Sequence, residues 1–493
     1  MAYCSRSPRR PPGIPSGCLL LLFALWPGLS RAEAPADEPS PAAAEETALA
    51  SPGLVYWLTA RQGYRLRDAR PGDEAAADPL APVAPATDQD LHLALDAGLL
   101  NGAGTLGADL ALGAWLDADG IAGDPAPLAF ASVRDGAAGR AASLYLASVF
   151  YRPGGWLKEV RLGRMSTGFG TRTVFDGASL SLLPLRGLRS PALARLELVA
   201  LGGRTAHLYE LDGEHFEDWL GAVALRLRPL RDLKLALDYR LMIEDSASAG
   251  LDHGYGLEAQ WRISDFLGAR LEVRGVDDAL SRLALAGRYW HEALGFGLDA
   301  RIDLQLSTLE ALNERDDPLF AILGPSHPNL RWDLDLFEEF ETGHADYVLH
   351  LGWQGREPLD GISAPFNRRQ GRLHLTGDAL ELVIPGLQAS LSLEYHHDGG
   401  DLGEGLLTLG GAAGYRSEAL RGLGGELGSY YQRFKYDYYA DVEERQDVRT
   451  FFVAAFVDAL PWLEVRLRYT LEHFDRTAHS FHFLLTQRLE GGR

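Results

Sequence analysis

Arginine and carboxylate residues recur two positions apart along many apolar segments of this 493-residue chain. Arg161 follows Glu159 at this spacing, and Arg274 follows Glu272. Residues two apart on a β-strand point to the same side, so each pair would share one face. A guanidinium presents a planar fork of donors that matches a carboxylate. The spacing therefore predicts either cross-strand ion pairs that hold a wet wall together or a surface that attracts anions.

Arrangements for catalysis or metal binding are weak in the sequence. The best catalytic candidate is AHSFH at 478–482, but His479 and Ser480 are adjacent and would point to opposite faces of a strand. His396, His397 and His344 lack the spacing of metal ligands, and no glycine-rich phosphate loop follows a strand and opens a helix. We therefore expect no enzyme activity, no cofactor and no metal site.

The segments that carry these residues alternate apolar with other residues from Leu54 onward, which is the period of β-strands. We count 22 such segments. Tight turns at 101–105, 153–155, 229–232, 264–265, 291–293 and 458–461 alternate with mostly longer polar connections at 67–89, 118–141, 204–216, 244–253, 307–328, 354–369 and 396–404. Short connections at one end and long ones at the other are typical of transmembrane β-barrels.

We therefore predict an all-β fold, a transmembrane antiparallel β-barrel of 18–22 strands over residues 54–493 in the cell outer membrane, with short periplasmic turns and long extracellular loops. The alternative is a large secreted all-β protein. In the barrel, the hairpin around 145–164 would turn Leu144, Leu146, Val160 and Leu162 to lipid and Glu159, Arg161 and Gly163 to the lumen. Tyr151 and Trp156, which flank its turn, would lie in an interfacial aromatic girdle.

The first 53 residues differ from the rest. Arginines precede an apolar run at 18–29 that ends in Ser30-Arg31-Ala32, the layout of a signal peptide over residues 1–32. Residues 33–53 are rich in Ala, Pro and Glu, which predicts a disordered periplasmic tail. Cys4 and Cys18 both lie in the signal, so the mature chain has no thiol. A net charge of -21 argues against nucleic acid as a partner.

The segment VRLGRMSTGFGTRTVFDGASLSLLPL at 160–185 resembles the alginate-export family of outer-membrane porins. In that family a strand ends in Gly-Arg, a loop of Gly and Arg follows, and Phe-Asp-Gly or Phe-Asp-Ala opens the next strand. The matching positions here are Gly163, Arg164, Gly168, Gly170, Arg172, Phe175, Asp176 and Gly177. The resemblance implies a passive conduit that exports a polysaccharide, and the arginines of the lumen would suit an anionic one.

Two other functions remain open, a general or sugar-selective diffusion porin and a non-conducting surface or structural barrel. An exporter needs a wide lumen gated by a segment such as 118–141 or 377–386, whereas a porin needs one inward loop that makes a permanent constriction. Expected partners are the polysaccharide, outer-membrane lipid and lipopolysaccharide, and a periplasmic protein of an export machinery. The residues predicted to bind substrate in the lumen are Arg161, Arg164, Arg172, Asp176, Arg240, Arg262, Arg274, Arg288 and Arg301.

Overall fold

The computed structural model describes residues 53–71, 86–118, 140–169, 173–206, 218–243, 251–277, 279–307, 327–359, 369–398, 405–436, 444–473 and 476–491. These residues form 22 strands of one sheet. The predicted signal peptide and nearly all of the predicted tail lie outside the described residues. The strands are β1 (Leu54–Pro71), β2 (Ala86–Asn101), β3 (Leu106–Asp117), β4 (Arg140–Tyr151), β5 (Leu157–Ser166), β6 (Val174–Leu182), β7 (Glu197–Thr205), β8 (Trp219–Leu230), β9 (Leu233–Ile243), β10 (Leu251–Arg262), β11 (Leu267–Val276), β12 (Ala279–His291), β13 (Phe296–Gln305), β14 (Asn329–Glu341), β15 (Asp346–Pro358), β16 (Gln370–Leu380), β17 (Leu387–Asp398), β18 (Gly405–Ser417), β19 (Leu423–Tyr436), β20 (Glu444–Leu460), β21 (Leu463–His473) and β22 (Arg476–Gly491).

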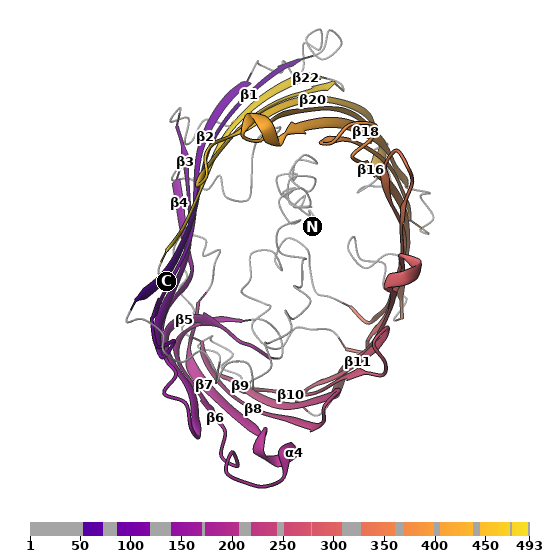
Figure 1. Cartoon of the computed structure of the whole chain (residues 1–493). Helices are drawn as coiled ribbons and strands as arrows, with labels where there is room; N and C mark the ends of the chain where they lie inside the picture. Colours follow the sequence, from indigo (N-terminus) through magenta and orange to yellow (C-terminus); the bar gives the residue numbers. More distant parts are fainter. Residues whose placement is uncertain are drawn as a thin grey trace, which may run out of the picture.

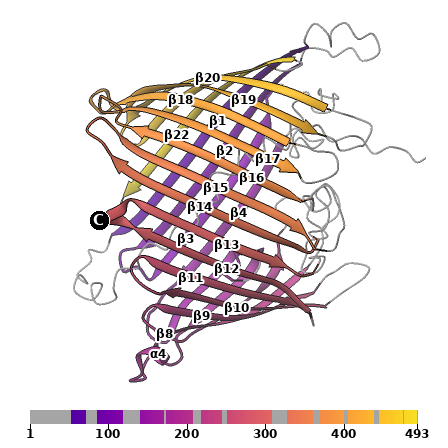
Figure 2. The same ribbon diagram turned by 90° about the vertical axis from the view of Figure 1, so that its right-hand side faces the viewer.

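Each strand pairs antiparallel with its neighbours in the sequence, and β1 pairs with β22 to close the sheet. Figure 1 shows the closed ring, which is elongated in cross-section. Figure 2 shows that the strands run obliquely, as closure of a barrel requires. The prediction of an antiparallel β-barrel and the count of 22 strands are confirmed.

The connections at the two ends of the barrel differ as predicted. All the predicted tight turns fall at the end where β1 begins, and all the predicted long connections fall at the opposite end. The turn after β2 shows how local sequence makes a tight one. Asn101 Oδ1 accepts hydrogen bonds from the backbone N–H groups of Thr105 and Leu106 at 2.8 and 3.0 Å, and Gly104 adopts a φ of 69°. The longer connection between β6 and β7, at the same end as the tight turns, carries α4 (Pro191–Ala194).

Some connections are shorter than predicted because charged residues extend the strands. β1 continues to Pro71 and β2 begins at Ala86, whereas the sequence predicted a loop over 67–89. Arg65 and Asp90 are cross-strand partners, and Arg65 Nε donates to Asp90 Oδ2 at 2.9 Å. Asp90 is fully buried and also accepts from Trp115 Nε1 at 2.9 Å. Polar cross-strand pairs of this kind extend the backbone pairing of β1 and β2 beyond the apolar part of the strands.

Apolar side chains on alternate positions point away from the barrel. On β15, Leu349, Leu351 and Trp353 are 39%, 38% and 51% exposed. Similar rows on most other strands form a continuous apolar surface, far more than a soluble monomer exposes. No helix among the described residues is long and apolar enough to cross a membrane. The apolar outer surface and the closed sheet place the protein in the outer membrane, where every backbone group is paired inside the sheet.

The predicted orientation of one hairpin residue is wrong. Leu144 points outward and is 37% exposed, but Leu146 is partly buried inside the barrel against Met165 and Phe175. The reason is a register shift between β3 and β4, where Ala111 pairs with Leu146 but Leu112 pairs with Leu144. The extra residue reverses the alternation of side chains along β4. Tyr151 and Trp156 are 49% and 65% exposed beside their turn, in keeping with a girdle.

Candidate functional site

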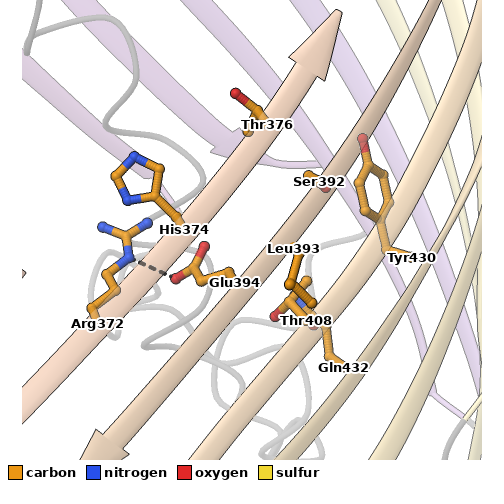
Figure 3. Close-up of a pocket in the computed structure, with 9 residues that line it drawn as sticks. All are labelled: Arg372, His374, Thr376, Ser392, Leu393, Glu394, Thr408, Tyr430 and Gln432. Carbon is orange, nitrogen blue, oxygen red and sulfur yellow. Dashed lines mark hydrogen bonds and ion pairs between the residues drawn. The ribbon is translucent and has the colours of Figure 1, made fainter. Parts of the chain in front are cut away.

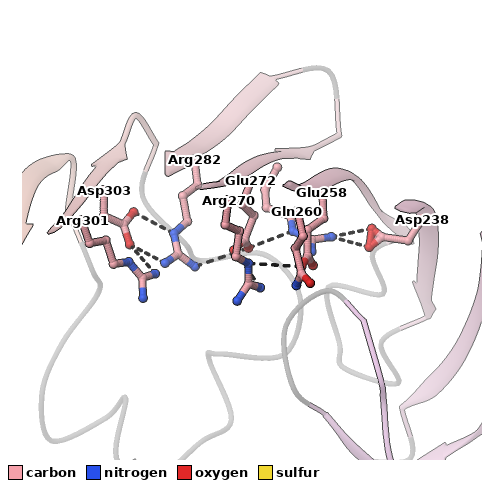
Figure 4. A network of polar contacts seen from close by, with 9 residues as sticks. Asp238, Glu258, Gln260, Arg270, Glu272, Arg282, Arg301 and Asp303 are labelled. Atoms are coloured by element: carbon pink, nitrogen blue, oxygen red, sulfur yellow. Dashed lines mark hydrogen bonds and ion pairs between the residues drawn. The ribbon is translucent and has the colours of Figure 1, made fainter. Parts of the chain in front are cut away.

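A continuous network of arginines and carboxylates lines the inside of β9 to β13 (Figure 4). Arg274 binds Asp238, and its Nε lies 3.1 Å from Glu272 Oε1. Arg282 Nε donates to Asp303 Oδ1 at 2.8 Å, and its Nη1 lies 3.8 Å from Glu272 Oε1. Glu272 and Asp303 thus each contact more than one guanidinium, which links the pairs into one network and holds both kinds of charge in place.

The register of the strands explains why these side chains meet. Asp238 of β9 pairs with Gly256 of β10, and Gly256 pairs with Arg274 of β11. Because Gly256 has no side chain, Arg274 reaches across the whole width of β10 to Asp238. A Cβ atom at this position would overlap with the Arg274 guanidinium and the Asp238 carboxylate. The glycine is therefore required for a contact between strands that are not neighbours.

Most of the predicted lumen arginines have acidic partners. Arg161 Nη1 lies 2.7 Å from Asp109 Oδ2, and its Nε lies 3.0 Å from Glu159 Oε1. Three further arginines of the predicted set also lie near a carboxylate. The shortest distances are 2.7 Å for Arg262 to Asp232, 3.5 Å for Arg288 to Asp299 and 3.1 Å for Arg301 to Asp303. Of the two alternatives from the sequence, the ladder of ion pairs describes this wall. The guanidiniums still face the lumen, since the Arg288 and Arg301 side chains are 63% and 49% exposed.

Arg164 and Asp176 do not face the lumen, so their predicted place there is wrong. They pair directly across β5 and β6, Arg164 near the end of β5 and Asp176 near the start of β6. They alternate with inward Met165 and Phe175 and share the outward side with the exposed Leu162 and Leu180. Arg164 binds Asp176 through two hydrogen bonds of 2.7 and 2.6 Å. The pair thus lies on the outer surface, close to the outer ends of its strands.

The described ends of the connection between β5 and β6, residues 167–169 and Thr173, lie against the inner wall of the barrel. Arg226 Nη2 donates to the Gly168 carbonyl at 3.1 Å, and its guanidinium lies 6.0 Å from the ring of Phe169. Arg226 is beyond the middle of β8, so this contact is inside the barrel and not at its rim. Arg240 of β9 donates to Thr173 Oγ1 at 3.2 Å. In Figure 1 the ribbon beside the β5 label extends into the ring.

An apolar cluster lies inside the barrel at the ends of β5 and β6 that lead into this connection. It consists of Met165, Phe175 and Leu220, which are at most 4% exposed, with Leu146 and Leu201 packed against them. Apolar side chains on an inward face stay dry only when other groups cover them. The predicted motif residues Gly170 and Arg172 lie outside the described residues. Arg226 is not among the residues predicted to bind substrate, yet its hydrogen bond to Gly168 shows most directly that this segment points inward.

The inner face of β14 to β17 carries histidines in place of the arginine network. Arg372 and His374 of β16 lie beside Glu394 of β17 (Figure 3), and Arg372 Nε donates to Glu394 Oε1 at 2.8 Å. They border a pocket of about 370 Å³ that is also lined by Thr376, Ser392, Leu393, Thr408, Tyr430 and Gln432. The pocket combines a charged pair, hydroxyl groups, an amide and an aromatic ring.

Two arginines of like charge face each other on the inner wall. Arg331 of β14 and Arg356 of β15 are cross-strand partners at the border between the arginine network and the histidine sector.

The catalytic candidates His479 and Ser480 are separated as the sequence predicts. His479 points outward beside Tyr469, whose hydroxyl lies 2.8 Å from His479 Nδ1, whereas Ser480 takes the inward position opposite Thr470.

A closed barrel, apolar outside and charged inside, defines the class of outer-membrane β-barrels with porin architecture. No family model matches the chain, and no curated protein matches it in sequence. Solved structures that resemble it are porins. A BenF-like porin from Pseudomonas fluorescens Pf-5 is 11% identical, with 89% of this chain and 99% of that chain covered and a TM-score of 0.43.

OccK2 (OpdF) of Pseudomonas aeruginosa is 12% identical, with 89% and 98% of the two chains covered and a TM-score of 0.43. The same protein has been solved in complex with glucuronate, and that structure aligns with 13% identity, 89% and 98% coverage and a TM-score of 0.42. Similarity at this level identifies neither a family nor a substrate for this chain. Nothing found supports the alginate-export family in particular.

Proposed function

We propose that the protein is a diffusion porin that passes small polar solutes, with a preference for anions. The observation that carries this proposal is the pair of contacts by which Arg226 and Arg240 hold Gly168 and Thr173, at the two ends of the β5–β6 connection, against the inner wall. A segment fixed inside the lumen narrows it permanently and needs no gating movement. A narrowed channel suits molecules of the size of a sugar or a small acid better than a polymer.

The charged wall supports rapid passage with weak binding. Each arginine of the network already has a carboxylate, so a passing anion meets guanidinium groups whose charge is partly offset. Conduction requires that a solute bind well enough to enter and weakly enough to leave. Exposed guanidiniums such as those of Arg270, Arg288 and Arg301 offer many weak contacts in place of one tight site.

The pocket on β16 to β19 favours a solute that carries hydroxyl groups. Arg372 and His374 lie at one side of it and Tyr430 at the other (Figure 3). A volume of about 370 Å³ is at the small end of the range for binding sites of small molecules. A monomeric hydroxy acid would find a cation, hydroxyl groups and a ring there, and would fill the space.

Polysaccharide export, which the sequence resemblance implies, is the second candidate. It shares the requirement for a wet, charged lumen, and the same arginines would contact the polymer. It needs in addition a passage wide enough for a chain beside the β5–β6 connection. The segments at 118–141 and 377–386 that were expected to gate an exporter give no support, since most of the first is outside the described residues and the second contains the tight turn between β16 and β17.

Efflux from vesicles separates the candidates. Liposomes that contain the folded protein are loaded with a monomeric uronate or with a long uronate oligomer, and release is measured. A diffusion porin should release the monomer and retain the oligomer, whereas release of both would favour export. Release of neither would favour a closed surface barrel.

A variant lacking residues 168–172 tests the constriction itself. It should show a larger single-channel conductance than the unaltered protein, because the segment held by Arg226 is gone. An unchanged conductance would mean that this segment does not limit the channel. Migration on a gel with and without boiling confirms that the variant has folded.

A further inference from the structure

Three metal-binding side chains meet on the inner wall of the barrel, from three adjacent strands. They are Asp335 of β14, His350 of β15 and His374 of β16, and one ligand atom from each lies within 4.8 Å of the others. His350 Nε2 is 2.9 Å from Asp335 Oδ1, and His374 Nε2 is 3.7 Å from the same oxygen. Among the described residues, these three form the sole group of this kind.

The strand register brings them together through a glycine. Asp335 pairs with Gly352, and Gly352 pairs with His374. A Cβ atom at Gly352 would overlap with the His374 ring, so the bare backbone lets this ring lie over β15 toward Asp335. His350 precedes Gly352 by two positions and therefore shares its inward face. The three groups converge without distortion of the sheet.

Ring contacts hold the two imidazoles in place. His350 stacks on Phe337 with ring centroids 4.4 Å apart and an interplanar angle of 3°. The His374 ring meets His350 edge-on, with centroids 4.6 Å apart. Two neighbouring polar atoms, His374 Nδ1 and Asp333 Oδ1, are buried and have no hydrogen-bond partner among the described residues. Unsatisfied buried groups are rare in proteins, and the free carboxylate oxygen of Asp333 points to a cation bound nearby.

We propose that Asp335, His350 and His374 bind a divalent transition-metal ion of the zinc type at the lumen wall. Two imidazole nitrogens and one carboxylate oxygen make a donor set that zinc accepts with a fourth position left open. Ligand atoms of a tetrahedral zinc ion lie about 3.4 Å apart, close to the 2.9 and 3.7 Å found here. The open position would face the lumen.

A bound ion would offset the negative charge of this sector. Asp335 pairs with Asp299 across β13 and β14, Asp333 is two positions from Asp335 on the same face, and a divalent ion adds two positive charges beside them. The Arg372 guanidinium nearby is paired with Glu394, which offsets its repulsion of a cation. The site would therefore let a metal ion raise the preference of the channel for anions. The proposal of metal binding does not depend on the proposed transport function.

Metal binding is tested directly on the purified, folded, tag-free barrel. Calorimetric titration with ZnCl₂ should show one equivalent bound by the unaltered protein. His350→Gln, His374→Gln and Asp335→Asn should each weaken binding by more than about tenfold, since even loss of a group that only orients a ligand costs about 10- to 100-fold. The control is His482→Gln, an inward histidine on β22, outside the triad and on a strand that does not adjoin β14 to β16.

Two outcomes would overturn the proposal. One is an unaltered protein that binds no zinc, and the other is triad variants that bind it as the control does. Co²⁺ provides a second readout, because a tetrahedral nitrogen and oxygen site gives it a visible absorption band that the variants should lose. If the barrel binds zinc but does not conduct, the metal site stands and the proposed porin function fails.

Discussion

The arginine network on β9 to β13 and the histidine sector on β14 to β17 are built in the same way but differ in the side chain that meets the carboxylate. Each uses an inward glycine, Gly256 or Gly352, so that a long side chain crosses one strand to reach a carboxylate on the next. In the network every carboxylate that is reached meets a guanidinium. In the histidine sector, Asp335 is hydrogen-bonded to the His350 imidazole in place of a guanidinium, and two nearby buried atoms, His374 Nδ1 and Asp333 Oδ1, have no partner among the described residues.

This difference indicates that these two parts of the wall have different tasks. A guanidinium carries several donors and satisfies a carboxylate completely, so the network is a closed structure that stabilises the sheet. An imidazole has one donor when neutral and leaves a lone pair free. The histidine sector therefore retains the capacity to bind an ion or a solute. The following three experiments test this comparison, in order of expected effect.

Removal of one guanidinium from the arginine network should lower the free energy of unfolding more than removal of a charge from the histidine sector. Arg274→Met leaves Asp238 and Glu272 without their shared cation, although their side chains are only 8% and 15% exposed. We expect the free energy of unfolding to fall by about 2–3 kcal/mol, less than for a fully buried pair because the lumen is wet. Asp335→Asn in the histidine sector should change it by less than about 0.5 kcal/mol.

Urea-induced unfolding in lipid vesicles, followed by tryptophan fluorescence, measures both changes. The double variant Arg274→Met with Asp238→Asn is the control, and it should recover part of the loss because it leaves one unpaired charge fewer. Equal losses for Arg274→Met and Asp335→Asn would contradict the comparison.

The border between the two sectors should control selectivity with little effect on stability. Arg331 and Arg356 face each other across β14 and β15, and like charges in this position repel. Arg331→Gln should lower the preference for anions, seen as a shift of the reversal potential under a salt gradient. The free energy of unfolding should stay the same or rise by up to about 1 kcal/mol.

The shift caused by Arg331→Gln should fade at high salt. The screening length falls from about 10 Å near 0.1 M to about 3 Å near 1 M, so a wall charge is felt less by an ion in the middle of the lumen. If the variant and the unaltered protein have the same reversal potential at low salt, Arg331 does not contribute to the ion selectivity of the channel.

The outward arginine should have the smallest effect. Arg164 lies on the lipid side of β5 with Asp176, so Arg164→Gln should leave conductance and reversal potential unchanged. It also serves as the matched control for Arg331→Gln, since both remove one guanidinium. A change of selectivity in Arg164→Gln would place its charge within reach of the lumen and contradict the observed side-chain alternation.

The architecture could be predicted because it depends on local alternation and on turn residues. The strands, their number and the short turns follow from apolar residues two apart and from glycines such as Gly104. Side-chain direction could be predicted only where alternation is regular. It held for Arg161 and Arg274, but it failed at Leu146, where a bulge adds a residue to β4. The lumen position predicted for Arg164 came with the family resemblance, whereas the alternation of β5 continues past Leu162 and turns Arg164 outward.

The metal triad could not be found from the sequence for a different reason. Asp335, His350 and His374 have no motif spacing, because they come together through the register of three strands and the absence of a side chain at Gly352. Register depends on the lengths of the turns and on pairing along the whole strand. The inward position of the β5–β6 connection likewise depends on Arg226 and Arg240, which belong to other strands.

The pairing of β1 with β22 has a consequence for how the barrel closes. Their register runs from Tyr56 and Gly491 to Pro71 and Arg476, whereas β4 and β5 pair only from Ala147 and Arg164 to Tyr151 and Val160. Until β22 pairs with it, β1 is an exposed edge with unpaired backbone groups, and such edges promote aggregation. The barrel is therefore complete only when both ends of the chain are present, and this long seam protects the two strands that would otherwise be its edges.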